Sequence, residues 1–272
     1  MIMVSVDLTP LARPYDHVLL DLDGCLWVGD EAIPGATEAL AALRAAGKHL
    51  VFLTNDPRHA PEEYVRKLWR LGFQASLDEV VTVGSVVQFL LAESRRPRTA
   101  YVIGSEAMAE HVAAGGMRVV NGSDLASRAD LVVVAGHDLL DYAELRTAVQ
   151  AVRRGAELLG TTRDATFPMP DGPWPGTGAV LAAVETGAGR VADLIAGKPE
   201  PSMYAAAIDR LGPGRVLAVG DRLDTDIAGA RRAGFDAALV LSGASTREEA
   251  GAADPAPTHI AESLAHLVLR DW

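Results

Sequence analysis

The sequence predicts an α/β fold, a Rossmann-like doubly wound parallel sheet interrupted by a second, inserted α/β domain. Short apolar runs alternate with longer segments that carry Ala and Leu at helical spacing. The apolar runs are continuous Val, Leu and Ile, as expected for strands whose two faces are both covered. Because strands and helices alternate along the chain, most strands are expected to pair in parallel, with helices on the sheet faces.

The elements of the first part of the chain follow this pattern in order. Strands are expected at 17–22, 49–53 and 80–83, and helices at 36–46, 61–71 and 85–93. Gly47 and Gly72 follow the first two helices, where glycine commonly ends a helix. Residues 1–94 therefore form the first part of the core domain.

A second alternating series starts after the basic segment RRPR at 95–98, a plausible hinge. Its expected strands are 100–103, 131–135 and 157–160, and its helices 106–114, 142–154 and 179–185. The Gly- and Pro-rich stretch 168–178 is expected to be loop. The first pattern resumes with strands at 194–196, 216–219 and 237–241 and helices at 202–211, 225–233 and 262–269. These series predict an inserted domain at 95–192 and the second part of the core at 193–272.

Composition limits the partners of the chain. Lys and Arg number 25 against 36 Asp and Glu, a net charge of −11 that repels nucleic acid and acidic membranes. An anionic substrate would therefore need a local positive trap. Cys25 is the only cysteine, and neither a signal-peptide pattern nor an apolar run long enough to span a membrane is present, so a cytoplasmic protein is expected.

Polar residues follow the predicted strands, and the carboxyl ends of parallel strands meet at one edge, where ligands bind. Asp21 and Asp23 lie in LLDLDGCL, either as a solvated turn or as carboxylates that a cation satisfies. Thr54 and Asn55 lie in FLTNDP, which fits a helix start and also a phosphate cradle.

Two further motifs lie in the last part of the chain. Lys198 in AGKPEP is either a surface lysine or part of a phosphate trap. Asp221, Asp224 and Asp226 lie within six residues in VLAVGDRLDTDIAGA. The dipole of the following helix could favour an acidic residue at this position. The mutual repulsion of three carboxylates, however, favours a bound cation.

Together, DLDGCL, TN, GKP and GDRLDTD resemble the four motifs of the haloacid dehalogenase superfamily over nearly the whole chain. The inserted domain lies between the second and third motifs, where one subgroup carries a large α/β cap. That subgroup contains 4-nitrophenyl, phosphoglycolate, glycerol-phosphate and pyridoxal phosphate phosphatases. DATFP and PGTGA are also similar to segments of this subgroup.

The resemblance implies a Mg²⁺-dependent phosphatase that acts on a small phosphomonoester of the glycerol phosphate, phosphoglycolate, pyridoxal phosphate or nucleotide monophosphate class. In such an enzyme Asp21 attacks phosphorus and forms an aspartyl-phosphate, and Asp23 is the general acid and base. The residues expected to bind phosphate are Thr54, Asn55 and Lys198. Mg²⁺ is expected on Asp21, the backbone carbonyl of Asp23, and Asp221, with Asp226 as a further ligand or an orienting residue. No role follows for Asp224.

The cap should choose the substrate, with Thr162, Arg163 and Asp164 as the specificity candidates. Many relatives carry Asn-Pro-Asp here, so this departure leaves the substrate open. Arg163 could pair with a second anionic group of the substrate or be a solvated loop residue. Relatives frequently dimerise through the cap, so a homodimer is possible. The alternatives are a phosphotransferase or mutase of the same superfamily and a non-catalytic phosphate-ligand binding protein; no G-x-G-x-x-G follows the first strand to support a dinucleotide site.

Overall fold

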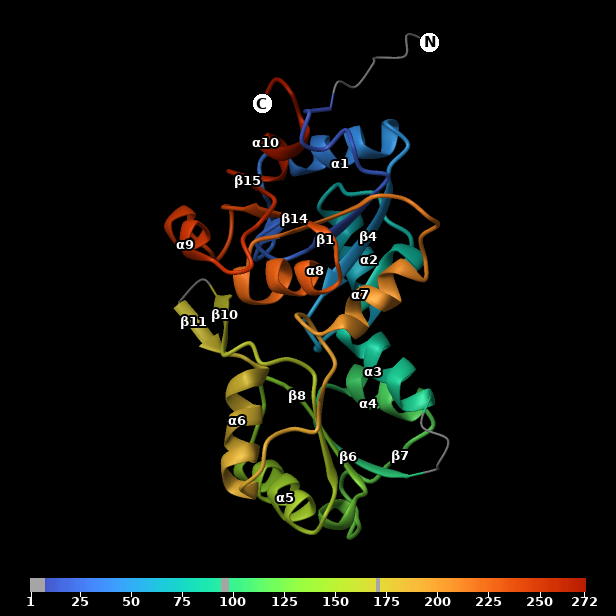
Figure 1. Cartoon of the computed structure of the whole chain (residues 1–272). Coiled ribbons are helices and arrows are strands. Elements are labelled where there is room, and N and C mark those ends of the chain that lie inside the picture. Colours follow the sequence, from blue (N-terminus) through green and yellow to red (C-terminus); the bar gives the residue numbers. More distant parts are fainter. Residues whose placement is uncertain (1–7, 94–97, 170–171) are drawn as a thin grey trace. The chain divides into compact units, whose positions relative to one another are not determined.

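The computed structural model describes residues 8–93, 98–169 and 172–272 of the chain. These residues form two compact units. Unit 1 contains the residues up to 54 together with 62–81 and 198–272, and unit 2 contains 55–61 and 82–197. Figure 1 labels elements of both units where there is room. None of the described helices is long and apolar enough to cross a lipid bilayer.

Unit 1 is built on a six-stranded sheet with the order β15-β14-β13-β1-β4-β5. β1 pairs in parallel with β13 and β4, and β14 pairs in parallel with β13 and β15. The strands are β1 (His17–Asp21), β4 (His49–Thr54), β5 (Val80–Thr82), β13 (Val216–Gly220), β14 (Asp236–Val240) and β15 (His259–Ala261). A small hairpin, β2 (Trp27–Val28) with β3 (Glu31–Ala32), follows β1.

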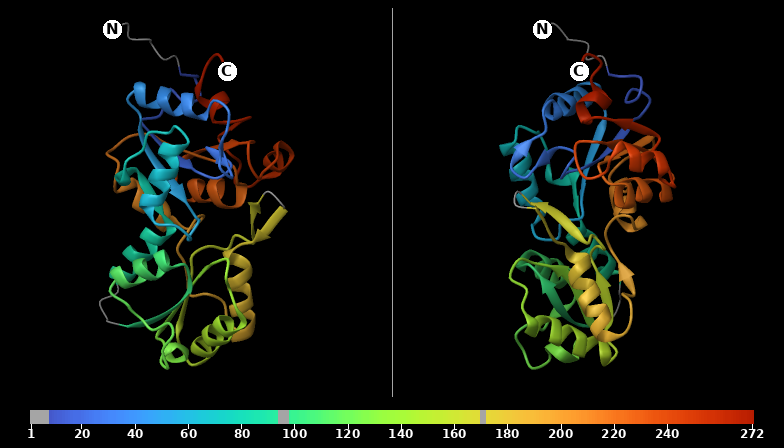
Figure 2. Two further views of the ribbon diagram at one scale, coloured as in Figure 1. Left: turned by 180° about the vertical axis from the view of Figure 1, so that it is seen from behind. Right: turned by 90° about the vertical axis from the view of Figure 1, so that its left-hand side faces the viewer.

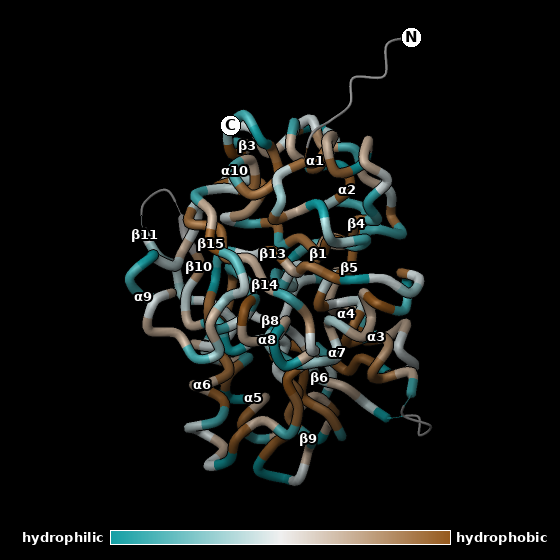
Figure 3. Tube along the Cα trace, turned by 45° about the horizontal axis from the view of Figure 1, so that its top comes forward, coloured by the Kyte–Doolittle hydropathy of each residue, from teal (hydrophilic) through white to brown (hydrophobic). Residues whose placement is uncertain are grey.

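Helices cover both faces of this sheet, which confirms the doubly wound core. α1 (Ala36–Ala45) and α2 (Pro61–Arg70) lie on one face, and α7 (Pro201–Ile208) and α8 (Ala228–Arg232) lie on the other (Figures 1 and 2). Two short helices complete the unit, α9 (Arg247–Ala252) and α10 (Leu264–Val268). Val18 and Leu20 of β1 join the apolar cluster beneath α1 and α2. Figure 3 shows that the hydrophobic residues concentrate along the central strands.

Unit 2 is a separate α/β unit with its own core. Its parallel sheet has the order β12-β9-β8-β6-β7. The strands are β6 (Thr99–Gly104), β7 (Arg118–Val119), β8 (Leu131–Gly136), β9 (Glu157–Gly160) and β12 (Leu194–Ile195). The helices are α3 (Val83–Ala92), α4 (Glu106–Ala114), α5 (Tyr142–Arg153) and α6 (Thr177–Ala188). Ile103, Val132 and Leu158 are fully buried members of its apolar cluster. An inserted α/β domain was expected, and this unit confirms it.

The expected domain boundaries at 94/95 and 192/193 stay predictions, and the points at which the chain passes between the compact units differ from them. They lie at 81/82 and 197/198, and the segment 55–61 also belongs to unit 2. The first shift occurs because α3 packs closely on α4: a Cβ built at Gly84 would lie 2.5 Å from the His111 ring. The second occurs because β12 pairs with β9, so Leu194 lies in the sheet of unit 2. Of the hinge expected at 95–98, only Arg98 lies within the described residues.

The expectation of loop throughout 168–178 is wrong. β10 (Thr166–Met169) and β11 (Gly172–Pro175) form an antiparallel hairpin, with Phe167 opposite Trp174 at a ring-centroid distance of 6.3 Å. Proline lacks an amide hydrogen, but in a two-stranded ribbon each strand keeps one edge without ladder hydrogen bonds, where proline is tolerated. The single helix expected at 225–233 is also wrong, since a π-helical turn (Leu223–Ile227) precedes α8.

Candidate active site

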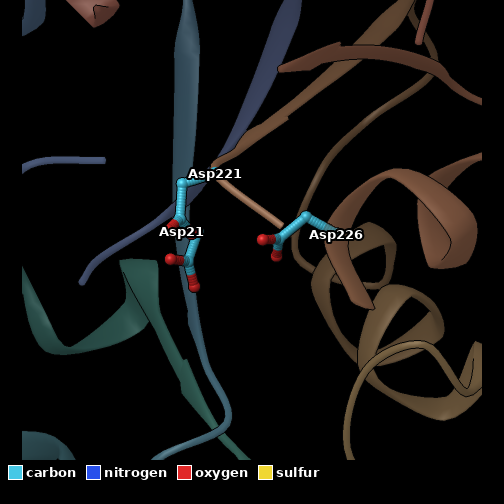
Figure 4. Close-up of side chains that lie close together, drawn as sticks. All are labelled: Asp21, Asp221 and Asp226. Atoms are coloured by element: carbon cyan, nitrogen blue, oxygen red, sulfur yellow. The ribbon is translucent and has the colours of Figure 1, made fainter. Parts of the chain in front are cut away.

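Three carboxylates meet at the carboxyl edge of the sheet in unit 1. Asp21 ends β1, and Asp221 follows β13, which pairs directly with β1. Asp226 comes from the π-helical turn that leads into α8. Each residue offers a carboxylate oxygen within 4.8 Å of the other two, and Figure 4 shows the Asp226 carboxylate directed toward the pair formed by Asp21 and Asp221.

Glycines allow these carboxylates to approach the main chain. A Cβ built at Gly24 would lie 2.7 Å from Cγ of Asp221, and one at Gly243 would lie 2.5 Å from the same atom. A Cβ at Gly220 would lie 2.5 Å from Oδ2 of Asp226. Since real Cβ atoms do not approach heavy atoms so closely, a side chain at any of these positions would displace a carboxylate.

Lys198 supplies the positive charge of the cluster. Its side chain is 4% exposed, and its Nζ contacts Oδ1 of Asp21 and lies 2.7 Å from Oδ1 of Asp226. Backbone amides add two hydrogen bonds: Ala244 donates to Oδ2 of Asp221 at 2.6 Å, and Arg222 donates to Oδ2 of Asp226 at 3.1 Å. Each carboxylate is therefore held in a defined orientation.

Burial and charge together perturb the protonation of the cluster. Burial raises the pKa of Asp21 well above its ordinary value, and the nearby Lys198 ammonium only partly opposes this shift. Burial, followed by the charge of Asp226, raises the pKa of Asp221 from 3.8 to about 7. Burial would lower the pKa of Lys198, but the charges of Asp21 and Asp226 raise it well above its usual value. The single ammonium of Lys198 therefore does not offset the negative charge of the three carboxylates.

The donor set fits a divalent cation with a preference for oxygen. Three carboxylates face a single ammonium, so the ionised cluster has an excess of negative charge. Mg²⁺ and Ca²⁺ both take carboxylate oxygens, and Mg²⁺ keeps several waters. Asp21, Asp221 and Asp226 are therefore the described residues that could hold such an ion.

Asp23 and Thr54 lie at the same edge of the sheet. Oδ1 of Asp23 accepts a hydrogen bond of 2.8 Å from the indole Nε1 of Trp27. Trp27 is fully buried, so it gives the Asp23 side chain a rigid support. Thr54 is the last residue of β4 and is 2% exposed.

The remaining candidates belong to unit 2. Nδ2 of Asn55 donates to Oδ2 of Asp164 at 3.1 Å. Arg163 forms a bidentate ion pair with Glu185 of α6, at 2.9 and 3.2 Å. Thr162 is 1% exposed, and its hydroxyl accepts a hydrogen bond from the Asp164 amide.

Sequence reasoning missed several groups of the cluster. The amide of Ala244 and the glycine at 243 follow β14, so their place after a strand could have indicated them. Tyr204 donates from its hydroxyl to the carbonyl oxygen of Asp226 at 3.0 Å, a contact that no local pattern predicts. Asp224, for which no role was expected, pairs with Arg222 at 2.9 Å.

Comparisons with known proteins agree on one family. A family model described as haloacid dehalogenase-like hydrolase matches residues 18–118, and a second, described as HAD-hydrolase-like, matches 195–267. The chain is 37% identical to chronophin of Homo sapiens, over 92% of this chain and 91% of chronophin. It is 35% identical to the D-glycerol 3-phosphate phosphatase of Mycobacterium tuberculosis, over 94% of this chain and 72% of that protein.

Solved structures support the same placement. The glycerol phosphate phosphatase of Mycobacterium tuberculosis in complex with magnesium matches with a TM-score of 0.86 at 34% identity, covering 96% of this chain and 79% of that chain. The 4-nitrophenylphosphatase of Thermotoga maritima matches with a TM-score of 0.87 at 30% identity, covering 95% and 98%. The chain therefore belongs to the haloacid dehalogenase-like hydrolase family, in the subgroup that contains these phosphatases.

Proposed function

We propose that the protein is a Mg²⁺-dependent phosphatase that hydrolyses a small phosphomonoester through an aspartyl-phosphate. The observation that carries this proposal is the buried cluster of Asp21, Asp221 and Asp226 with Lys198 at the carboxyl edge of one sheet. A cluster of this kind can bring an anionic nucleophile and an anionic substrate together, because its cations offset their repulsion.

In the proposed reaction Asp21 attacks phosphorus, so that a carboxylate oxygen forms the new bond while the bond from phosphorus to the leaving oxygen breaks. Asp23 gives its proton to the leaving alcohol and then takes a proton from the water that attacks the aspartyl-phosphate. The hydrogen bond from Trp27 supports this role, since it holds the Asp23 side chain in one orientation.

The remaining side chains bind the phosphoryl group and the metal. Mg²⁺, held by Asp21, the Asp23 carbonyl and Asp221, would neutralise charge on the transferred group. Lys198, Thr54 and the backbone N–H of Asn55 supply further positive potential and hydrogen bonds to phosphate oxygens. Asp226 lies within the same carboxylate cluster and pairs with Lys198, which supports a role as orienting residue or additional ligand.

The substrate class is proposed from the relatives, among them phosphatases named for glycerol phosphate, sugar and nitrophenyl substrates. Glycerol phosphate and phosphoglycolate are the first compounds to test, followed by pyridoxal phosphate and nucleotide monophosphates. Thr162 stays a candidate for the cap side of substrate binding. The ion pair of Arg163 with Glu185 favours a structural role for Arg163. A cytoplasmic location and a homodimer stay predictions.

A turnover assay tests the function directly. The wild-type protein should release inorganic phosphate from 4-nitrophenyl phosphate with Mg²⁺ and lose this activity with EDTA. Asp21→Asn should remove turnover while the circular dichroism spectrum is unchanged. Transfer of phosphate to an alcohol without release to water would indicate the phosphotransferase alternative, and phosphate binding without turnover would indicate a binding protein. Near wild-type activity of Asp21→Asn would refute the proposed mechanism.

A further inference from the structure

The chain passes between the two units inside both predicted phosphate-binding motifs. It first leaves unit 1 between Thr54 and Asn55, and after passing through 62–81 of unit 1 it returns to that unit for the last time between Gly197 and Lys198. On the unit 2 side of these crossings, Asn55, Thr161, Asp164 and Gly197 lie together, and we call them the junction cluster. The contacts within this cluster determine the position of the Asn55 side chain.

The carboxamide of Asn55 is fixed from two directions. Its Nδ2 donates to Oδ2 of Asp164 at 3.1 Å. Its Oδ1 lies against the main chain of Gly197, where an added Cβ would be 2.6 Å from that oxygen and 2.7 Å from the carbonyl oxygen of Thr161. The Gly197 amide also donates to that carbonyl at 2.7 Å. The hydrogen bond to Asp164 sets the orientation of the carboxamide, because a flipped carboxamide would turn its oxygen toward the carboxylate.

Asp164 is itself rigidly supported by unit 2. Its amide donates to Oγ1 of Thr162 at 3.2 Å, and its carbonyl accepts from the Gly178 amide at 2.8 Å in the first turn of α6. A Cβ built at Gly178 would lie 2.8 Å from that carbonyl oxygen, so glycine is needed for the contact. A carboxylate on such a fixed backbone can orient its hydrogen-bond partner, as supporting groups do in other sites.

We propose that Asp164 is a positioning residue that acts through Asn55, and that it does not choose the leaving group. This inference rests on the proposed function, in which Asn55 helps to bind the phosphoryl group. Since the phosphoryl group is common to all substrates, the loss of Asp164 should impair every phosphomonoester by the same factor. A residue that contacted the leaving group would instead impair some substrates more than others.

The test is a double-mutant cycle on Asn55→Ala and Asp164→Ala with three substrates: 4-nitrophenyl phosphate, glycerol 3-phosphate and phosphoglycolate. Asp164→Ala should lower kcat/KM by about 10- to 100-fold, because small misplacements of a binding group cost factors of this size. The factor should be equal for the three substrates and should disappear in the Asn55→Ala background. Asp164→Asn should retain most activity, since its amide oxygen still accepts the hydrogen bond.

A control variant and a binding measurement distinguish the positioning role of Asp164 from a general effect of substitution in unit 2 and from failure of the proposed function. Glu110→Ala removes an exposed carboxylate from the same unit and should leave kcat/KM unchanged. A selective loss for one substrate, or additive losses in the double variant, would overturn the positioning role. Should the wild-type turn over none of the substrates, the proposed function fails, and the cycle is run on binding of inorganic phosphate by calorimetry. There, equal affinity of wild-type and Asp164→Ala would overturn the inference.

Discussion

Replacing Asp221 by Asn removes a carboxylate that the metal-free folded protein accommodates poorly. Burial and the charge of Asp226 raise its pKa from 3.8 to about 7. For an acid whose pKa is higher in the folded state, the folded protein binds more protons than the unfolded chain between the two values. The free energy of unfolding therefore falls as the pH rises from about 4 to about 7, and the full cost is present above that range.

The magnitude follows from the same linkage. A difference of about three pH units between folded and unfolded pKa values corresponds to roughly 4 kcal/mol at neutral pH. Because Asn keeps a carbonyl oxygen for the Ala244 amide, Asp221→Asn should gain about 2–4 kcal/mol at about pH 7.5 in EDTA. For a chain of this length that gain raises the melting temperature by roughly 5–15 °C. The gain should nearly vanish at about pH 4.

Thermal denaturation followed by circular dichroism measures this effect at the two pH values, with EDTA and with Mg²⁺. Added Mg²⁺ should stabilise the wild-type protein and should have little effect on Asp221→Asn, since a bound cation offsets the same charge. Asp224→Asn is the control, because this carboxylate is 67% exposed in an ion pair with Arg222 and should change stability by less than about 1 kcal/mol. A variant less stable than the wild-type at neutral pH in EDTA, or equally stabilised at both pH values, would refute the reasoning.

Three further substitutions probe the supports of the site. Lys198→Met leaves the buried carboxylates of Asp21 and Asp226 without their ammonium and should lower the free energy of unfolding by about 3–5 kcal/mol. Urea denaturation of the metal-free protein measures this loss, and an unchanged denaturation midpoint would contradict the ion pairs. Gly243→Ala should weaken Mg²⁺ binding by about 10-fold or more in calorimetry, because its Cβ displaces Asp221, and wild-type affinity would count against that packing. Trp27→Phe should lower kcat by about 10-fold with little change in KM, since it removes the hydrogen bond that orients Asp23; a rise in KM alone would argue against this support.

Much of the fold follows from the hydrophobic pattern. The strand expected at 17–22 is β1 (His17–Asp21), and the helix expected at 36–46 is α1 (Ala36–Ala45). Strands buried on both faces leave continuous apolar runs that are visible in sequence. The hairpin of β10 and β11 leaves no such run, because its order depends on pairing between strands rich in proline and glycine. Two-residue strands such as β2 are too short to show any period.

The site was partly predictable for a similar reason. Asp21 and Asp221 follow apolar strands, and because the carboxyl ends of parallel strands meet at one edge of a sheet, the sequence predicted that they would lie at the same edge. The approach of Asp226 to the same point depends on the π-helical turn, which no spacing rule indicated. The hydroxyl of Tyr204 reaches Asp226 from α7 through tertiary packing. Such contacts between distant segments require the folded chain.

The close approach of glycine backbone to Asp221 has a consequence for protein engineering. Positions 24 and 243 have no room for any side chain, so a mutant library that varies them would consist mostly of inactive members. Libraries built on this protein should therefore keep glycine at both positions.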